Sequence, residues 1–294
     1  MKSLQGIRRR RGFTLTELLV AVTIIAMIAA MAVGGLQFAR QEARLARTKA
    51  TVAKLNQVIS ERYESYMTRR VPVDLGGLSA RNAAEVRLTA LRYLMMMEMP
   101  ERINDLNISN AGPIAMPHDG RSDQGSPRQR RLPWSSLALR YAMQYQQRQP
   151  TAENIHAEML FMIVTMGNPE DRELFIDQEI GDTDNDGWME FLDGWGKPIY
   201  FLRFAPGYSG FSALQSGNPQ LDHDPFDTRK VQPDAFHLVP LIYSAGPDKK
   251  YGINVGQGVQ FRGNPFADLT IGSADPGEPG GLFDNITNHS IEQR

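Results

Sequence analysis

The sequence predicts an α+β fold, with a long N-terminal helix, then a helical insertion, then a C-terminal head that contains short strands and a calcium-type loop. Residues 18–36 contain no charged side chain, and the helical pattern continues beyond them to about residue 70. Residues 71–150 show further helical patterns around a segment rich in Gly, Pro, Ser and charge. Residues 151–294 combine one apolar helical run with short apolar stretches between turn-forming residues, which is typical of short strands.

The composition is that of a folded protein, and it narrows the classes of function. The 294 residues are 41% hydrophobic and 22% charged, which is enough for one or two modest cores. There is no cysteine, so disulfides, thiolate metal sites and cysteine nucleophiles are excluded. A formal net charge of −1 argues against a protein that binds nucleic acid by electrostatics.

The first helix is predicted over residues 13–70, with a membrane-spanning part that ends at about residue 38. As a helix, the charge-free run 18–36 is about 28 Å long, close to the hydrocarbon thickness of a bilayer. Arg8 to Arg11 precede this run, and the positive-inside rule keeps such a cluster in the cytoplasm and sends the rest across. A signal peptide or a plain anchor is the alternative, but the run is longer than an ordinary signal peptide needs.

Beyond the apolar run, the helix is predicted to be amphipathic. A stripe of apolar residues recurs at helical spacing between Arg, Lys, Gln and Glu, so it is expected to pack on the rest of the protein. Gly34 and Gly35 each lower helix propensity by about 1 kcal/mol, which predicts a softened point or a kink there. The stripe consists of Leu45, Val52, Leu55, Ile59, Tyr63 and Tyr66.

Glu17 stands at the edge of the apolar run, where a carboxylate is costly and therefore a candidate for function. The segment GFTLTELLV around it resembles the prepilin signature of type IV pilins and type II secretion pseudopilins. The resemblance implies a leader over residues 1–12, cleavage after Gly12 by a prepilin peptidase and N-methylation of Phe13. It also implies that Glu17 meets the N-terminal amine of a neighbouring subunit, which would neutralise the carboxylate. Loss of the leader would shift the formal charge from −1 to about −6.

The same resemblance implies a pilin-like fold, in which the long helix packs on a small antiparallel sheet. It also implies a single-pass protein of the bacterial inner membrane that assembles into a filament. Its expected partners are the peptidase, other pilin or pseudopilin subunits, an inner-membrane assembly platform and membrane lipid, with no nucleic acid indicated. The globular part is expected outside the cytoplasmic membrane. A secretion pseudopilus, a pilus and a DNA-uptake fibre all remain open, as do a major and a minor role.

The middle segment, residues 71–150, is predicted to be a helical insertion whose role the sequence does not state. One helix is expected over Asn82–Met99, with Pro100 ending it, and another over Trp134–Gln149. Between them, residues 107–133 are predicted to form a mobile loop. The methionines of the MMMEM stretch at residues 95–99 are expected to fill core space and not to bind a soft metal.

The C-terminal head, residues 151–294, is predicted to start with a helix that has Thr151 as its N-cap and an apolar face from Ile155 to Met166. His156 on this helix is expected to be a surface or boundary residue. No second histidine lies at ligand spacing from it, so it is not interpreted as a metal ligand.

The segment DTDNDGWMEFLD matches the D-x-D-x-D-G pattern of a calcium loop with a carboxylate at position twelve. Calcium takes six to eight oxygen ligands, and alternate aspartates can converge on one ion while Gly187 permits the sharp turn. Without a cation, carboxylates so close together would repel one another, although an acidic turn with no ion is the alternative. The predicted Ca²⁺ ligands are Asp182, Asp184, Asp186, the Trp188 carbonyl, Glu190 and Asp193.

Two later segments resemble the strand regions of major type II secretion pseudopilins. DGWGKPIYFLRF at residues 193–204 is similar to the stretch that leads into their first strand, and LIYSAGPDKKYG at 241–252 is similar to a later strand and loop. In that family the C-terminal loop binds calcium, which by position implies Asp248 as a ligand here. Lys249 and Lys250 replace the family's glycine, so calcium at residues 182–193, near Asp248, or at both remains open.

No catalytic motif is recognisable, so the sequence predicts a structural subunit and not an enzyme. The chain has no G-x-S-x-G, H-E-x-x-H, Walker loop or dinucleotide-binding fingerprint. The alternatives are a stand-alone anchored calcium-binding adhesin or surface-binding protein and, less favoured, an enzyme tethered to the membrane. An adhesin would show surface delivery and ligand binding with no secretion defect on deletion.

Overall fold

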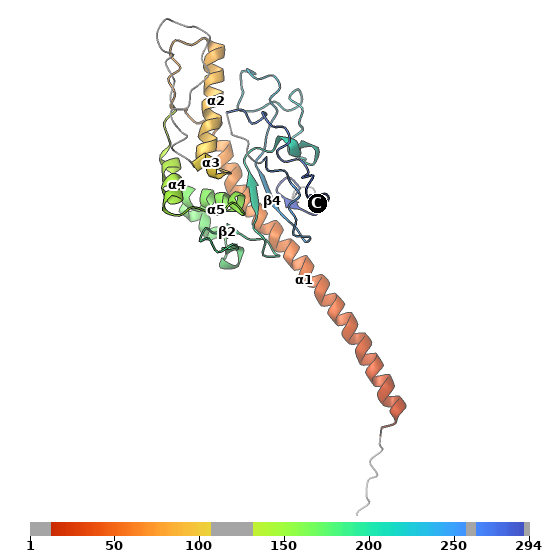
Figure 1. Cartoon of the computed structure of the whole chain (residues 1–294). Helices are drawn as coiled ribbons and strands as arrows, with labels where there is room; N and C mark the ends of the chain where they lie inside the picture. The colour runs from red at the N-terminus through yellow and green to blue at the C-terminus, as the bar shows by residue number, and fades with distance from the viewer. Residues whose placement is uncertain (1–12, 107–131, 257–262, 291–294) are drawn as a thin grey trace, which may run out of the picture. The chain divides into compact units, whose positions relative to one another are not determined.

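The computed structural model describes residues 13–106, 132–256 and 263–290 (Figure 1). The predicted leader with Gly12, and the predicted mobile loop up to residue 131, lie outside the described residues. The chain divides into two compact units, one up to Arg44 and one from Leu45 onward. The second unit, called the folded unit below, contains the cores, the sheets and every cluster discussed after the N-terminal segment.

Helix α1 runs without interruption over Leu15–Ser65, so the predicted long helix is confirmed (Figure 1). The helix does not break at Gly34 or Gly35, where a softened point or a kink was predicted. A Cβ atom added at either glycine would have nothing within 4 Å, so no contact within the described chain requires glycine there.

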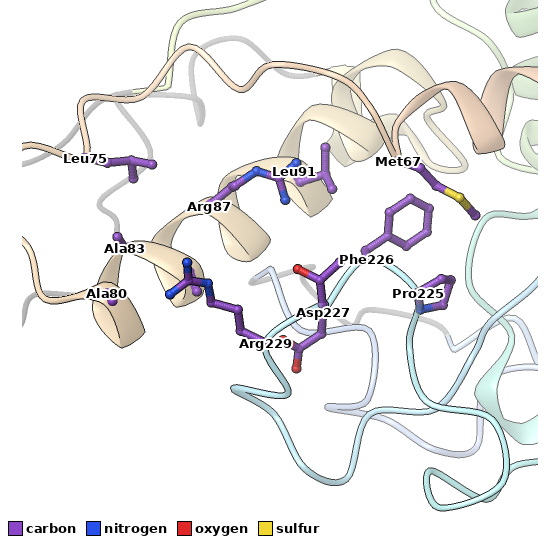
Figure 2. Close-up of a pocket in the computed structure, with 12 residues that line it drawn as sticks. Met67, Leu75, Ala80, Ala83, Arg87, Leu91, Pro225, Phe226, Asp227 and Arg229 are labelled. Atoms are coloured by element: carbon purple, nitrogen blue, oxygen red, sulfur yellow. The ribbon is translucent and has the colours of Figure 1, made fainter.

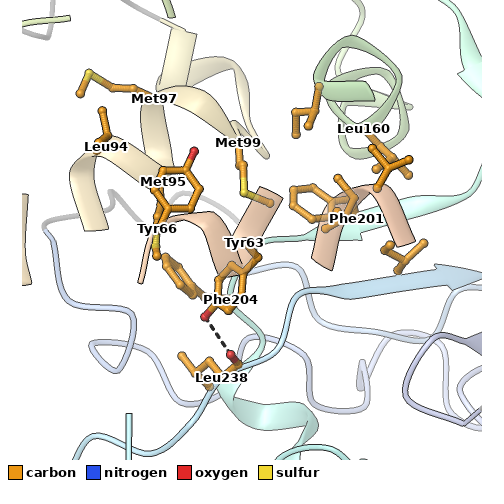
Figure 3. Packing of buried hydrophobic residues seen from close by; sticks show 14 of the residues in the cluster. Tyr63, Tyr66, Leu94, Met95, Met97, Met99, Leu160, Phe201, Phe204 and Leu238 are labelled. Carbon is orange, nitrogen blue, oxygen red and sulfur yellow. Dashed lines mark hydrogen bonds between the residues drawn. The ribbon is translucent and has the colours of Figure 1, made fainter. Parts of the chain in front are cut away.

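The C-terminal part of α1 belongs to the folded unit and buries the predicted stripe. Its core residues Val52, Leu55, Ile59 and Tyr63 are buried, and Leu45 is partly buried at the edge. Tyr63 donates its hydroxyl to the carbonyl of Leu238 at 2.8 Å (Figure 3). The 3.6-residue spacing of the stripe therefore predicted the buried face correctly.

The helical insertion consists of α2 over Ala80–Glu98, α3 over Ile103–Leu106 and α4 over Ser136–Gln147. The side chain of Ser79 caps α2 by accepting from the Asn82 N–H at 3.2 Å. Met95, Met97 and Met99 are almost fully buried and belong to the same core cluster as Tyr66, which directly follows α1 (Figure 3). The methionine stretch therefore fills core space, as predicted.

Helix α5 covers Ile155–Gly167 and contacts strands β2 and β3. Two predictions about its start were wrong. Asn154, and not Thr151, occupies the N-cap position. His156 is buried, with an exposed fraction of 7%, because this turn of α5 faces the tyrosine-rich side of the sheet, where Tyr200 lies 5.8 Å away between ring centroids.

The strands are short and form two antiparallel sheets, which confirms a small antiparallel sheet as the partner of the helices. Strand β1, Ile180–Gly181, pairs with β2, Glu190–Phe191. The second sheet has the order β3-β4-β5 and contains Tyr200–Leu202, Leu241–Ser244 and Ile286–Thr287. The last strand, β5, lies near the end of the described residues, after a segment rich in Gly, Pro and Asp. Short 3₁₀ helices cover Pro169–Leu174, Asp177–Glu179 and Pro206–Gly210.

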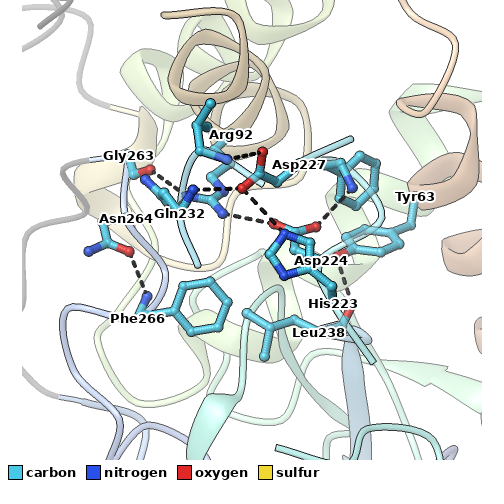
Figure 4. A network of polar contacts seen from close by, with 12 residues as sticks. Tyr63, Arg92, His223, Asp224, Asp227, Gln232, Leu238, Gly263, Asn264 and Phe266 are labelled. Carbon is cyan, nitrogen blue, oxygen red and sulfur yellow. Dashed lines mark hydrogen bonds and ion pairs between the residues drawn. The ribbon is translucent and has the colours of Figure 1, made fainter. Parts of the chain in front are cut away.

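A buried polar network connects α2 to the long connection between β3 and β4 (Figure 4). Arg92, 1% exposed, pairs with Asp224 at 2.8 Å and donates to the side chain of Gln232 at 2.7 Å. Asp227 in the same connection accepts from the backbone N–H groups of Val231 and Gln232. These bonds explain how a connection rich in Gly, Pro and Asp is ordered against a helix of the insertion.

Candidate functional site: the N-terminal segment and an acidic cluster

Glu17 takes part in a capping box at the start of α1. The Thr14 N–H and hydroxyl both donate to Glu17 Oε2, at 2.9 and 2.8 Å, and the Glu17 N–H donates to the Thr14 hydroxyl at 3.2 Å. The pattern T-x-x-E could have predicted this arrangement from the sequence. In the single chain, Glu17 therefore has a local partner, and that partner is uncharged.

The apolar side chains in the N-terminal part of α1 are exposed, because no other part of the described chain packs against them. Phe13 is 81% exposed, Met31 77% and Phe38 69%, and the most apolar window of α1 has none of its residues buried. The helix is long and apolar enough to cross a membrane by length and composition. So large an exposed apolar surface indicates contact with lipid or with other protein chains.

The acidic loop between β1 and β2 is held by its own backbone. The Gly187 N–H donates to Asp182 Oδ2 at 2.9 Å, and the Trp188 N–H donates to Asp186 Oδ1 at 2.7 Å. Gly187 has φ +86°, a backbone conformation that favours glycine, and a Cβ there would also displace the guanidinium of Arg148. As the sequence predicted, oxygens of Asp182, Asp184 and Asp186 lie within 4.8 Å of one another.

Helix α5 adds a carboxylate that the sequence analysis missed. One oxygen each from Glu158, Asp184 and Glu190 lie within 4.8 Å of one another, and Asp184 belongs to both groups of three. Glu158 is fully buried, and neither of its oxygens has a hydrogen-bond partner in the described chain. A signal existed: Glu158 is a lone acid within the apolar run of α5.

The electrostatics of the cluster follow from burial and from like charges. The pKa of Glu158 is raised to about 9. Burial is the largest cause, and the negative charges of neighbouring carboxylates, with Asp186 and Asp184 first, add to it. Burial also raises the pKa of Glu190 to about 7, against hydrogen bonds from Thr183 that lower it. Both shifts indicate a site with too much negative charge for its surroundings, which a cation would relieve.

Hydrogen bonds hold Glu190 and the segment before α5 in place. Glu190 accepts from the Thr183 N–H at 3.0 Å, from the Thr183 hydroxyl at 3.2 Å and from the Asn154 amide at 3.2 Å. The Thr151 N–H donates to Asp186 Oδ2 at 2.6 Å, and its hydroxyl donates to Asp184 Oδ2. Thr151 therefore contacts the acidic loop, which is why it is not available to cap α5.

Asp193, the predicted twelfth ligand, is engaged elsewhere. Its Oδ1 accepts from the N–H groups of Trp195 and Lys197 at 2.8 and 2.9 Å, and its Oδ2 accepts the Ser244 hydroxyl at 2.7 Å. Burial raises the pKa of this carboxyl group. The structure thus does not bring Asp193 to the acidic loop, because its hydrogen bonds shape the turn before β3 and tie it to β4.

Asp248 also lies outside both acidic groups that the described residues form. Its Oδ1 accepts from the Lys250 N–H at 2.8 Å, and its own N–H donates to Asp284 at 3.1 Å. Trp188, predicted to offer its carbonyl, is buried, and its indole N–H donates to the carbonyl of Arg148 at 3.2 Å.

The folded unit also contains a shallow groove of about 390 Å³ between α2 and the connection that follows residue 224 (Figure 2). Leu75, Ala83, Leu91 and Phe226 form apolar walls, and Arg87 lies at the rim (Figure 2). No group of convergent acids lies in it, so it offers no metal chemistry among the described residues.

A capped helix that is long and apolar enough to span a membrane, followed by a folded unit, is typical of an anchored protein. Residues 7–33 match the family described as the prokaryotic N-terminal methylation motif. This motif indicates the type IV pilin and pseudopilin family, whose members are generally structural subunits. It implies processing by prepilin peptidase and filament assembly and, with the apolar helix, anchoring in the inner membrane before assembly. No curated protein and no solved structure matches the chain.

Proposed function

We propose that this protein is a subunit of a type II secretion pseudopilus or a type IV pilus-like filament. Before assembly it is anchored by α1, with the N-terminus in the cytoplasm and the folded unit on the other side of the membrane. Prepilin peptidase cuts after Gly12, and the new N-terminal residue Phe13 is methylated. The observation that supports this most is the methylation motif over residues 7–33, at the start of an apolar helix that its own chain leaves exposed.

Assembly replaces lipid around α1 with the helices of neighbouring subunits. This exchange needs a contact that sets the register, because apolar surfaces alone slide past one another. Glu17 supplies that contact, since an ammonium group is a stronger partner for a carboxylate than the neutral Thr14 groups that bind it in the single chain. The amine of Phe13 in the next subunit is the cation that this role requires.

Calcium in the acidic loop stabilises the folded unit. Asp182, Asp184 and Asp186 would hold the ion, and Glu190 lies beside them in a position fixed by Thr183. An ion that binds the folded state and not the unfolded state adds free energy of unfolding in proportion to its occupancy. The folded unit would then be most stable outside the cytoplasm, where free calcium is higher.

The intact mass of the protein purified from membranes tests the central claim. The expected mass is that of a chain beginning at Phe13 with one added methyl group. A Gly12→Val variant, with a branched side chain at the cleavage position, is the control and is expected to keep its leader. A wild-type chain that retains residues 1–12, or that is cut at another position, would overturn the proposal.

A further inference from the structure

We propose that Glu158 of α5 is a ligand of the calcium site, in the place that the loop pattern assigns to Asp193. The inference rests on the calcium binding stated under the proposed function and adds a ligand from outside the loop. The cation site is then built from two segments, the acidic loop between β1 and β2 and one face of α5.

The first observation is that several buried carboxylate oxygens of the cluster accept no hydrogen bond from the described residues. Four buried oxygens in this cluster have no hydrogen-bond partner in the described chain, namely both oxygens of Glu158, Oδ1 of Asp182 and Oδ1 of Asp184. A buried acceptor without a partner is expensive, and a folded protein leaves few of them. Four such atoms in one place indicate a ligand that supplies positive charge.

The charge balance of the described residues points the same way. Glu158, Asp182, Asp184, Asp186 and Glu190 form no ion pair with any Lys, Arg or His of the described ranges. Arg148 lies against Gly187 at the edge of the loop, yet it forms no ion pair with these acids. The described residues therefore supply no cationic side chain to the buried oxygens of this cluster.

The spacing of the oxygens fits calcium. Two oxygens bound to one Ca²⁺ at about 2.4 Å lie at most about 4.8 Å apart. The oxygens of Glu158, Asp184 and Glu190 satisfy that limit, and so do those of Asp182, Asp184 and Asp186. The donor set contains carboxylate oxygens and no imidazole or thiolate, which favours a hard cation that accepts many oxygens.

Glu158 and Asp193 differ in their freedom to bind an ion. Both oxygens of Asp193 already accept hydrogen bonds from Trp195, Lys197 and Ser244, so they are committed to the turn before β3. Glu158 has two free oxygens and comes from a helix that also contacts β2 and β3. An ion bound by both Glu158 and the aspartates would link the acidic loop to α5.

The test is a Ca²⁺ titration of the full-length chain in detergent, by calorimetry and by competition with Tb³⁺, whose emission the adjacent Trp188 sensitises. Glu158→Gln keeps the size of the side chain and is expected to weaken Ca²⁺ binding on the order of 100-fold. Glu153→Gln is the matched control, since it removes the same charge from an exposed position five residues away, and it is expected to bind as the wild type does. Asp193→Asn is expected to keep its affinity for Ca²⁺.

Each outcome decides a separate question. Wild-type affinity in Glu158→Gln, with strong loss in Asp193→Asn, would overturn the inference and leave calcium binding by the loop intact. Equal loss in Glu153→Gln and Glu158→Gln would also overturn it, because a general charge effect would then explain both. If the wild type itself does not bind Ca²⁺, both the inference and the calcium part of the proposed function are wrong, whereas the processing at Gly12 is tested independently by mass.

Discussion

Replacing Glu158 by Gln is predicted to change the stability of the folded unit in opposite directions with and without calcium. In chelator at pH 7, the fully buried Glu158 is protonated in the folded protein, because its pKa is raised to about 9, whereas it is ionised in the unfolded chain. Taking up that proton on folding costs the wild type about 1–3 kcal/mol at pH 7, and this cost disappears as the pH falls toward the unfolded pKa. Gln has nearly the same shape and takes up no proton, so the variant is expected to be more stable than the wild type by about 1–3 kcal/mol in chelator at pH 7.

In calcium the order reverses. A ligand present at 100 times its Kd adds about 2.7 kcal/mol to the free energy of unfolding of the protein that binds it. The wild type gains this amount, and the variant loses most of it because its affinity is lower. For a unit of this size, 1 kcal/mol corresponds to about 2–4 °C in Tm, so each difference is measurable.

The assay is thermal unfolding of both full-length chains in detergent, followed by tryptophan fluorescence in chelator and in saturating calcium. Glu153→Gln, at an exposed position, is the control and should leave both Tm values near those of the wild type. If Glu158→Gln lowers Tm by the same amount in both conditions, Glu158 has a structural role without an ion and the reasoning is refuted.

Three further predictions concern other parts of the chain. Glu17→Gln can still accept hydrogen bonds from Thr14 but has no charge, so the variant should be processed normally and fail to assemble. Thr14→Val loses the cap and keeps the charge of Glu17, so it should still assemble. Normal assembly of Glu17→Gln would contradict the role given to the charge. Burial lowers the pKa of His289 to about 4. The unfolded chain therefore binds a proton at this residue first as the pH falls below about 6.5, and the contribution of His289 to the free energy of unfolding should fall by about 2 kcal/mol between pH 7 and 5. His289→Gln should flatten that part of the pH profile, and an unchanged slope would exclude His289 as its source. Met95→Ala should cost about 2–5 kcal/mol in chemical unfolding because Met95 is fully buried, and a cost under 1 kcal/mol would show that the core relaxes around the gap.

Local periodicity predicted the long helix well because a helix buries one face at a fixed spacing. The stripe through Val52, Leu55 and Ile59 lies in the core, as its spacing required. The same rule placed α2 and α4 within a few residues of their ends. These elements depend on neighbours in sequence, so the sequence alone contained the information.

The acidic site shows where such reasoning ends. The loop pattern identified Asp182, Asp184 and Asp186, whose order is local, but it could not show that α5 packs Glu158 against them. Nor could it show that Asp193 is bound by Ser244, which is far away in the chain. Both facts depend on tertiary packing, which no spacing rule contains.

The errors at the ends of elements have the same origin. Thr151 was a reasonable N-cap by residue type, yet its hydroxyl and N–H contact the acidic loop, and Asn154 occupies the cap position. Strand β5 over Ile286–Thr287 exists because β4 offers it an edge. Two residues have too little pattern of their own to reveal that pairing.

The Thr14–Glu17 pair has a consequence for the order of events in the life of the subunit. Both residues lie downstream of Gly12, so trimming the leader leaves the pair and the first turn of α1 unchanged. Under the proposed function, Thr14 binds the carboxylate while the subunit is in the membrane, and the ammonium group of a neighbouring subunit then replaces the Thr14 hydroxyl and N–H. Under the same proposal, removal of the leader creates this amine, so only a processed subunit could displace the Thr14–Glu17 hydrogen bonds of its neighbour.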